Sequence, residues 1–284
     1  MMTENMKKLG IIAGGGTIPK MLIEHCRKSG RPYFVLAIEG NADKEIMTGD
    51  VPHLWIRIGQ AGSGFKKFAE EKVQEVVMIG TIRRPSFSDL VPDWKTTAFF
   101  AKVGMKALGD DGILRALVKE IESEGMIVRG IHEVIPELLV KEGVLGKIKP
   151  DKQALADIRR GIEVVTELGR LDIGQGAVVQ QGLVLAVEAI EGTDKMLLRC
   201  GDYRRKGAGG VLVKLRKPQQ DMRIDLPTFG VRTIENAHKS GLRGVALHAG
   251  NGLIVDEAET IKLADKLGMF VVGVNPTDAK WKEA

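Results

Sequence analysis

The segment from Lys214 to Gly230 carries the densest group of side chains in this chain that could do chemistry. It holds four cations and two carboxylates within seventeen residues, namely Lys214, Arg216, Lys217, Asp221, Arg223 and Asp225. Cations bind anionic substrate oxygens, and carboxylates bind divalent metals, so one short segment offers both. The alternative is a solvated, charged surface strand that leads into a helix.

The spacing within this segment favours a functional role. Arg223 and Asp225 alternate with apolar residues, which predicts that on a strand both charged side chains share one face. Asp225 directly precedes Leu226-Pro227-Thr228, where such a strand would end. Ligands of α/β folds bind at the carboxyl ends of strands, so Asp225 is placed where a site is expected.

The composition limits the classes of function. The 284 residues are 44% hydrophobic and 28% charged, an ordinary globular balance with room for two domains. The net charge of +5 fits anionic substrates or an anionic membrane surface. With only 5% aromatic residues and no block of five like charges, nucleic-acid recognition is unsupported. Cys26 and Cys200 match no metal spacing and are expected to be buried, reduced thiols.

The amino-terminal residues have no apolar core typical of a secretory signal and lead directly into a predicted strand. No apolar run reaches the roughly 20 residues that a membrane-spanning helix needs. We therefore expect a cytoplasmic protein, with peripheral contact to a membrane surface as a compatible alternative.

Strand and helix patterns alternate over the first third of the chain, starting with a buried strand over Leu9–Ala13 and a helix over about 18–29. This alternation predicts an α/β fold with an N-terminal Rossmann-like parallel sheet over residues 1–131. Prolines and glycines over 132–150 predict a linker, and residues 151–284 are expected to form a C-terminal catalytic α/β domain.

Gly14-Gly15-Gly16-Thr17 follows the first strand and opens a helix, which is the geometry for an anion at a helix N-terminus. The segment matches neither G-x-G-x-x-G nor a Walker loop, so dinucleotide binding is weakly supported. Contact with a nucleotide or sugar phosphate and a simple tight turn both stay open. Arg83 and Arg84 follow another strand and are either phosphate ligands or solvated cations.

Carboxylates near the second half of the chain are candidate metal ligands. Glu188 ends a predicted strand, and Glu191 and Asp194 follow; one of these could join Asp225 around a hard cation. The alternative for Thr193 and Asp194 is helix capping and first-turn charge. Oxygen ligands with few histidines suit Mg²⁺ or Mn²⁺ better than Zn²⁺.

Several motifs occur together along almost the whole chain. They are Leu9-Gly-Ile-Ile-Ala-Gly-Gly-Gly16, Arg84-Pro85, Gly109-Asp110-Asp111, Leu171-Asp-Ile-Gly-Gln-Gly176, Gln181-Gly-Leu-Val-Leu-Ala-Val-Glu188, Glu191-Gly-Thr-Asp194, Lys217-Pro218 and Arg223-x-Asp225-Leu-Pro-Thr228-x-Gly230. In this order the chain resembles the LpxI family of UDP-2,3-diacylglucosamine pyrophosphatases. The C-terminal motifs are long and specific, whereas the glycine triplet alone is not.

The resemblance implies Mg²⁺-dependent hydrolysis of UDP-2,3-diacylglucosamine to UMP and 2,3-diacylglucosamine 1-phosphate (lipid X), a step of lipid A biosynthesis, and peripheral contact with the inner-membrane surface is compatible with it. It also implies water attack on the sugar-side phosphorus, and it places the family's essential aspartate at Asp225. Together with the charged residues described above, this leads us to expect Asp225, Lys214, Lys217 and Arg223 as catalytic groups, with the three cations on the diphosphate or the departing UMP. Asp225, with Glu188 and Asp194 as second choices, is the expected metal ligand, and the expected substrate-binding residues are Gly14, Gly15, Gly16, Thr17, Arg84, Gln181 and Thr228.

Two other functions remain open from the sequence. A transferase or nucleotide-sugar oxidoreductase would need NAD(P) binding, which the missing G-x-G-x-x-G disfavours. A non-catalytic sensor of nucleotide sugars or lipids would bind such a ligand tightly without forming product. A homo-oligomer is compatible with the sequence.

Overall fold

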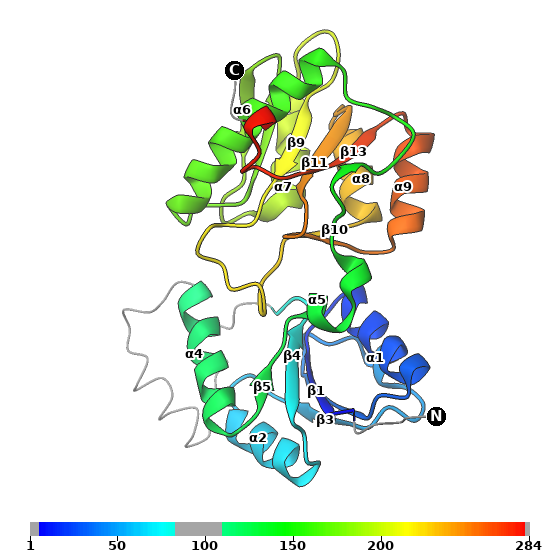
Figure 1. Cartoon of the computed structure of the whole chain (residues 1–284), viewed down its shortest axis with the longest axis vertical. Coiled ribbons are helices and arrows are strands. Elements are labelled where there is room, and N and C mark those ends of the chain that lie inside the picture. Colours follow the sequence, from blue (N-terminus) through cyan, green and yellow to red (C-terminus); the bar gives the residue numbers. More distant parts are fainter. Residues whose placement is uncertain (1–5, 83–109, 282–284) are drawn as a thin grey trace. The chain divides into compact units, whose positions relative to one another are not determined.

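The computed structural model describes residues 6–82 and 110–281, and the chain divides into two compact units (Figure 1). The first unit consists of residues 1–136 together with 221–224, and the second of residues 137–220 together with 225–284. Arg83, Arg84 and Gly109, which the sequence singled out, lie outside the described residues.

A parallel sheet forms the centre of the first unit, with strand order β3-β2-β1-β4-β5. Its strands are β1 (Leu9–Ala13), β2 (Tyr33–Ile38), β3 (His53–Ile56), β4 (Glu75–Ile79) and β5 (Ile127–Val128). The helical segments are α1 (Thr17–Ser29), η1 (Lys44–Met47), α2 (Ala61–Glu70), α4 (Asp110–Ser123), α5 (Ile131–Val134) and η4 (Pro136–Leu138), which ends in the second unit. This order is that of a doubly wound fold, so the Rossmann-like prediction is confirmed.

The core of the first unit is apolar on both sides of the sheet. Phe68 of α2 and Ile121 of α4 are fully buried in one cluster with side chains of β2 and β4. Helix α1 buries Leu22, Ile23 and Cys26. Burial raises the pKa of the Cys26 thiol to about 11, so this cysteine acts as a small apolar side chain, as expected.

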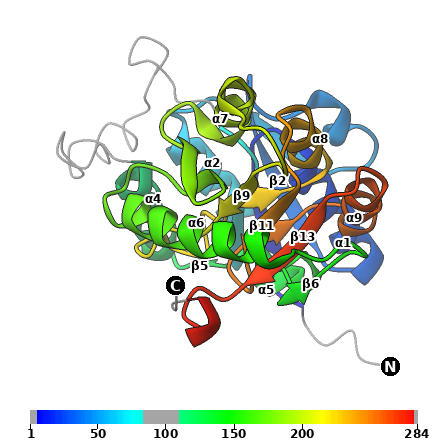
Figure 2. The same cartoon turned by 90° about the horizontal axis from the view of Figure 1, so that it is seen from above.

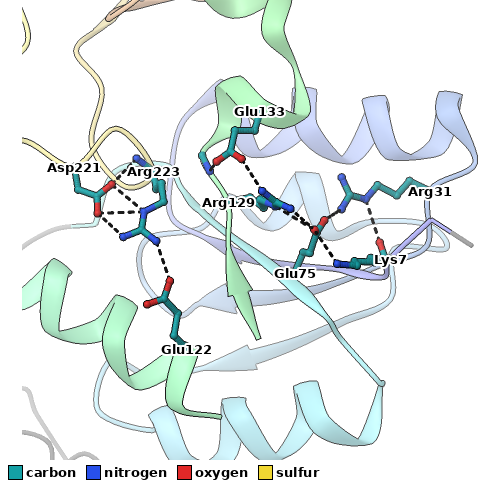
Figure 3. Close-up of polar contacts among 9 residues, drawn as sticks. Lys7, Arg31, Glu75, Glu122, Arg129, Glu133, Asp221 and Arg223 are labelled. Atoms are coloured by element: carbon teal, nitrogen blue, oxygen red, sulfur yellow. Dashed lines mark hydrogen bonds and ion pairs between the residues drawn. The ribbon is translucent and has the colours of Figure 1, made fainter. Parts of the chain in front are cut away.

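Glu75, the first residue of β4, gathers three cations at one buried carboxylate (Figure 3). Its oxygens lie 2.5 Å from Arg31 Nη2, 3.0 Å from Arg129 Nη2 and 3.9 Å from Lys7 Nζ. Arg129 also binds Glu133, four residues away. A buried carboxylate must be paired, and here the pairing ties the start of β4 to the segments after α1 and β5.

The second unit has a mixed sheet of order β6-β13-β11-β9-β7-β8. Strands β13, β11 and β9 run parallel, whereas β7 is antiparallel to both β9 and β8, and β6 is antiparallel to β13. The strands are β6 (Gly143–Val144), β7 (Gly176–Gln180), β8 (Leu183–Val187), β9 (Val211–Lys214), β11 (Gly244–His248) and β13 (Phe270–Val274). A separate parallel pair consists of β10 (Thr228–Phe229) and β12 (Leu253–Ile254).

Helices cover both faces of this second sheet (Figure 2). They are α6 (Lys152–Arg170), α7 (Gly192–Cys200), α8 (Val231–Lys239) and α9 (Glu257–Lys266), with short segments η5 (Gly201–Tyr203) and η6 (Ala279–Trp281). Ile158 and Ile162 of α6 pack with Val213 of β9 on one face. Leu197 of α7 and Ile234 of α8 pack with the opposite face, which gives three layers.

The segment predicted as a linker carries regular structure. Residues 132–136 belong to the first unit and 137–150 to the second. β6 adds an antiparallel strand to the sheet of the second unit through β13. The boundary between the two units thus falls inside this segment, and its glycines and prolines mark short elements and tight turns. No helix among residues 6–82 and 110–281 is long and apolar enough to cross a membrane.

Two carboxylates determine how helix α6 starts and what it contacts. The Asp151 side chain accepts a hydrogen bond from the Ala154 amide at 2.8 Å, which caps the helix. One turn further, Asp157 is 1% exposed and accepts from the amides of Gln181 (3.1 Å) and Gly182 (2.7 Å). These amides form the turn between β7 and β8, where Gln181 and Gly182 both have positive φ. The buried carboxylate therefore fixes this hairpin to α6.

We predict that Asp157→Ala lowers the free energy of unfolding by about 1–3 kcal/mol, because two turn amides lose a charged acceptor. Urea denaturation followed by circular dichroism measures this change. Glu163→Ala on the same helix is the matched control, since Glu163 makes only an exposed pair with Arg160 and should change stability by less than about 0.5 kcal/mol. Equal stabilities of the two variants would contradict the assigned role of Asp157.

Candidate active site

The carboxyl ends of β8 and β9 lie at the same edge of the second sheet, because both strands are antiparallel to β7. Lys214 is the last residue of β9 and is only 8% exposed. Its Nζ donates a hydrogen bond to Thr193 Oγ1 at 2.7 Å, and this hydroxyl donates to Glu188 Oε1 at 2.9 Å. A threonine hydroxyl thus connects a buried ammonium with a buried carboxylate.

Gly176 makes room for this arrangement. The Glu188 amide donates to the Gly176 carbonyl at 2.8 Å, which brings the two backbones together. A Cβ atom at Gly176 would lie 2.5 Å from Glu188 Oε2. A side chain at this position would therefore displace the Glu188 carboxylate, so close packing explains why glycine occupies it.

Asp225 is held by Gln220 at the end of the loop that follows β9. Gln220 Nε2 donates to Asp225 Oδ2, and Gln220 Oε1 accepts from the Lys217 amide at 3.1 Å. The Gln220 carbonyl accepts from Arg216 Nη1 at 2.7 Å. Since Gln220 is only 4% exposed, it orients the Asp225 carboxylate relative to this loop.

Lys217 lies close to the carboxyl end of α6. Its Nζ donates to Asp172 Oδ1 at 2.8 Å, and its backbone packs against Gly169. Both charged groups of this pair are partly accessible. The pair is therefore a weak restraint, and an anionic ligand could compete with Asp172 for the ammonium.

His248, the last residue of β11, accepts a hydrogen bond from the Arg216 amide through Nδ1 at 3.3 Å. Burial and the charge of Arg216 lower the pKa of His248 to about 4. The imidazole is therefore neutral near pH 7, and because Nδ1 accepts, its proton is on Nε2.

Unpaired polar atoms gather around this edge. Within the described part of the chain, the buried side-chain atoms without a hydrogen-bond partner are Gln175 Oε1, Glu188 Oε2, Arg216 Nε, His132 Nδ1 and Trp281 Nε1. The first three come from segments that meet at this edge, where the Leu215 amide donates to the Gln175 carbonyl at 3.0 Å. Unpaired buried polar groups are rare in folded proteins and are often found where a ligand binds.

The structure corrects the prediction for Arg223. Residues 221–224 form a turn of the first unit rather than a strand, so Arg223 and Asp225 do not share a strand face. Arg223 Nη2 binds Asp221 Oδ2 at 2.7 Å, and Arg223 Nη1 binds Glu122 of α4 at 2.8 Å (Figure 3). These partners, Asp221 first, raise the pKa of Arg223. The arginine thus anchors the turn, and Pro227 and the charged residues interrupt the expected strand.

The carboxylates predicted to hold a metal do not form one cluster. Asp194 Oδ1 accepts from Asn236 of α8 at 2.8 Å, and Asp194 Oδ2 pairs with Arg232. Glu191 pairs with Arg199 at 2.6 Å, a hydrogen bond that lowers the pKa of Glu191. Over residues 6–82 and 110–281, no group of three or more His, Cys, Asp or Glu side chains could hold a metal ion. Binding of Mg²⁺ here would need oxygens of the substrate in addition to Asp225.

Two predicted substrate-binding residues have local structural roles. Gln181 lies in the β7–β8 turn, at the sheet edge opposite Lys214, and its Oε1 and Nε2 bind Arg205 Nε and the Lys206 carbonyl at 3.1 Å each. Its assignment to this site is therefore not supported. Thr228 is the first residue of β10, and its hydroxyl donates to the Leu226 carbonyl at 3.2 Å.

The glycine triplet belongs to the first unit and is explained in part by packing. A Cβ at Gly14 would lie 2.6 Å from the Thr81 carbonyl oxygen, and one at Gly15 would lie 2.7 Å from the Asn41 carbonyl oxygen. Gly16 has φ 97°, and its amide donates to Asp43 Oδ2 at 3.3 Å, directly before α1 starts at Thr17. The tight-turn interpretation holds for these contacts, whereas phosphate binding stays a prediction.

Sequence reasoning missed Gln220 and His248, and it interpreted Thr193 as a helix cap. Only the distance of five residues between Gln220 and Asp225 could have suggested their contact, because no regular periodicity connects them. Thr193 makes no capping bond; its hydroxyl points to Glu188 and Lys214 instead.

We predict that His248 makes stability depend on pH. Its pKa is about 4 when folded and about 6.5 when unfolded, so between these values the unfolded state binds the extra proton. Stability therefore falls as the pH falls through this window. His248→Asn retains an acceptor near Nδ1 without titrating, and its urea midpoint should change less between pH 7 and pH 5 than that of the wild type. The same change in both proteins would contradict this role.

Comparison with known proteins identifies the family. Residues 8–138 match the LpxI N-terminal domain, and residues 141–272 match the LpxI C-terminal domain. The chain is 44% identical over 280 residues to UDP-2,3-diacylglucosamine pyrophosphatase LpxI of Caulobacter vibrioides, which covers 96% of this chain and 99% of that protein. A solved binary complex of leucoanthocyanidin reductase and NADPH from Vitis vinifera, at 12% identity and TM-score 0.30, is too dissimilar to inform the fold or the function. Both halves of the sequence thus match the same family in the same order, and the chain belongs to the LpxI family.

Proposed function

We propose that this chain hydrolyses the diphosphate bond of UDP-2,3-diacylglucosamine to UMP and 2,3-diacylglucosamine 1-phosphate, with Mg²⁺ as cofactor. The observation that carries the proposal is the 44% identity, over nearly the full length of both chains, to a UDP-2,3-diacylglucosamine pyrophosphatase. The buried charges at the carboxyl edge of β9 support it, because a diphosphate needs both cations and a metal-binding carboxylate.

Asp225 is the residue we assign to Mg²⁺, with Gln220 fixing the orientation of the carboxylate. Bound Mg²⁺ would neutralise charge on the diphosphate oxygens. Lys214 and Lys217 are the cations we assign to the diphosphate and the departing UMP. Lys217 would exchange its accessible Asp172 partner for a phosphate oxygen.

In the proposed reaction a water oxygen forms a bond to the phosphorus on the sugar side. The bond between that phosphorus and the bridging oxygen breaks, and its electron pair leaves with UMP. The water releases a proton, which passes to solvent or to a nearby carboxylate. Arg223 is not assigned to this step, since Asp221 and Glu122 bind its guanidinium.

We predict that Asp225→Asn, which keeps the size of the side chain, lowers kcat/KM for UMP release by roughly 10²- to 10⁴-fold. The assay follows UMP release from UDP-2,3-diacylglucosamine by purified protein. Asp278→Asn is the control, because Asp278 makes only a surface pair with Lys280. A rate for Asp225→Asn within tenfold of the wild type would remove Asp225 from its proposed role.

We further predict that EDTA abolishes UMP release and that added Mg²⁺ or Mn²⁺ restores it. Full activity in EDTA would overturn the metal proposal but leave the hydrolase proposal intact. If folded wild-type protein binds the UDP-sugar but releases no UMP with Mg²⁺, the non-catalytic sensor becomes the better explanation.

A further inference from the structure

Lys214 has an unusual environment for a buried ammonium. Lys214 as a whole is 8% exposed, yet no carboxylate oxygen within the described residues lies within 4.0 Å of its Nζ. Its hydrogen bond goes to a neutral hydroxyl, Thr193 Oγ1, at 2.7 Å. Because buried charges need a partner, Thr193 is the group through which Lys214 reaches the charge of Glu188.

The direction of the hydrogen bonds is fixed by chemistry. A lysine ammonium can only donate, and an ionised carboxylate can only accept. The Thr193 hydroxyl must therefore accept from Lys214 and donate its single proton to Glu188 Oε1. A side chain without this hydroxyl could not connect the two groups, whereas serine could.

The surrounding backbone holds Thr193 for this contact. Gly192 has φ 76°, a conformation that favours glycine, and it turns the chain from Glu188 into α7 directly before Thr193. Met196 and Leu197, which are fully buried, pack helix α7 against the core of the second unit. Thr193 is thus on a rigid element, as precise positioning requires.

We propose that Thr193 is a positioning residue, whose hydroxyl links the Lys214 ammonium to Glu188 and fixes its direction, so that its other two N–H donors can bind the substrate diphosphate. This inference rests on the proposed function. The ammonium has three donors, and Thr193 takes one of them. Without the hydroxyl, the flexible lysine side chain loses its fixed direction while keeping its charge.

The test compares Thr193→Val, which has the same shape but no hydroxyl, with Thr193→Ser, which keeps the hydroxyl. We expect the valine variant to lose roughly 10- to 100-fold in kcat/KM for UMP release, and the serine variant to stay within about threefold of the wild type. Thr166→Val is the matched control, because the Thr166 hydroxyl bonds only to Ile162 within α6. Equal losses in the serine and valine variants would overturn the proposal.

A double-mutant cycle tests whether Thr193 acts through Lys214. In a Lys214→Met background, Thr193→Val should change kcat/KM by less than about threefold, since the group that it positions is absent. The same large loss in both backgrounds would contradict a positioning role. If Thr193→Val does not fold, Thr193→Ala serves in its place.

A second readout separates this inference from the proposed function. If the wild type releases no UMP, the hydrolase proposal fails, but the contact can still be measured by urea denaturation of the same four proteins. Destabilisations that do not add would show the Thr193–Lys214 coupling. Strictly additive values would show that the hydroxyl does not hold the ammonium, and the inference would fall.

Discussion

The candidate site depends on the need of buried charges for partners. Lys214, Glu188 and Asp225 are placed by a sheet edge and by neighbouring side chains that are themselves buried or hydrogen-bonded. Because an unpaired charge in the interior costs several kcal/mol, each of these groups constrains the segments around it. The antiparallel strand β7 makes this possible, since it brings the ends of β8 and β9 to one edge.

The two sheets differ in how their buried polar groups are paired. The first is parallel throughout its described strands, and the buried carboxylate of Glu75 is surrounded by cations at the start of β4. That cluster is saturated with ion pairs, as in a structural network. The second sheet is mixed, and unpaired atoms of Gln175, Glu188 and Arg216 remain near its carboxyl edge. The gathering of three unpaired groups at this edge of the second sheet indicates where ligand chemistry is expected.

Much of the fold was predictable from the sequence, because long apolar patterns report burial directly. The alternation of strands and helices that forms the first sheet follows from periodicity and from glycine and proline positions. Residues 221–226 were not predictable in this way. Their alternation is that of a strand, but Ile224 packs with the core of the first unit and Arg223 binds Glu122 of α4. These contacts join residues about a hundred positions apart, so local periodicity does not report them.

The site was predictable in part for the same reason. The sequence selected Asp225, Lys214 and Glu188, which lie in or beside the hydrogen-bonded groups at the edge of the second sheet. It could not show that Gln220 orients Asp225, because the contact depends on the shape of a loop. Gln181 was assigned to the wrong end of the sheet. It follows the carboxyl end of β7, and because β7 is antiparallel to β9, this end lies at the edge opposite Lys214.

Residues 221–224 belong to the first unit although their neighbours in sequence belong to the second, and this limits how the architecture can evolve. The chain leaves the second unit after Gln220, contributes Ile224 to the core of the first unit, and returns at Asp225. Each unit is therefore incomplete as a continuous stretch of gene. If recombination fused residues 1–136 alone to an unrelated domain, the first unit would lose the core contact of Ile224. The two units are therefore expected to be inherited together.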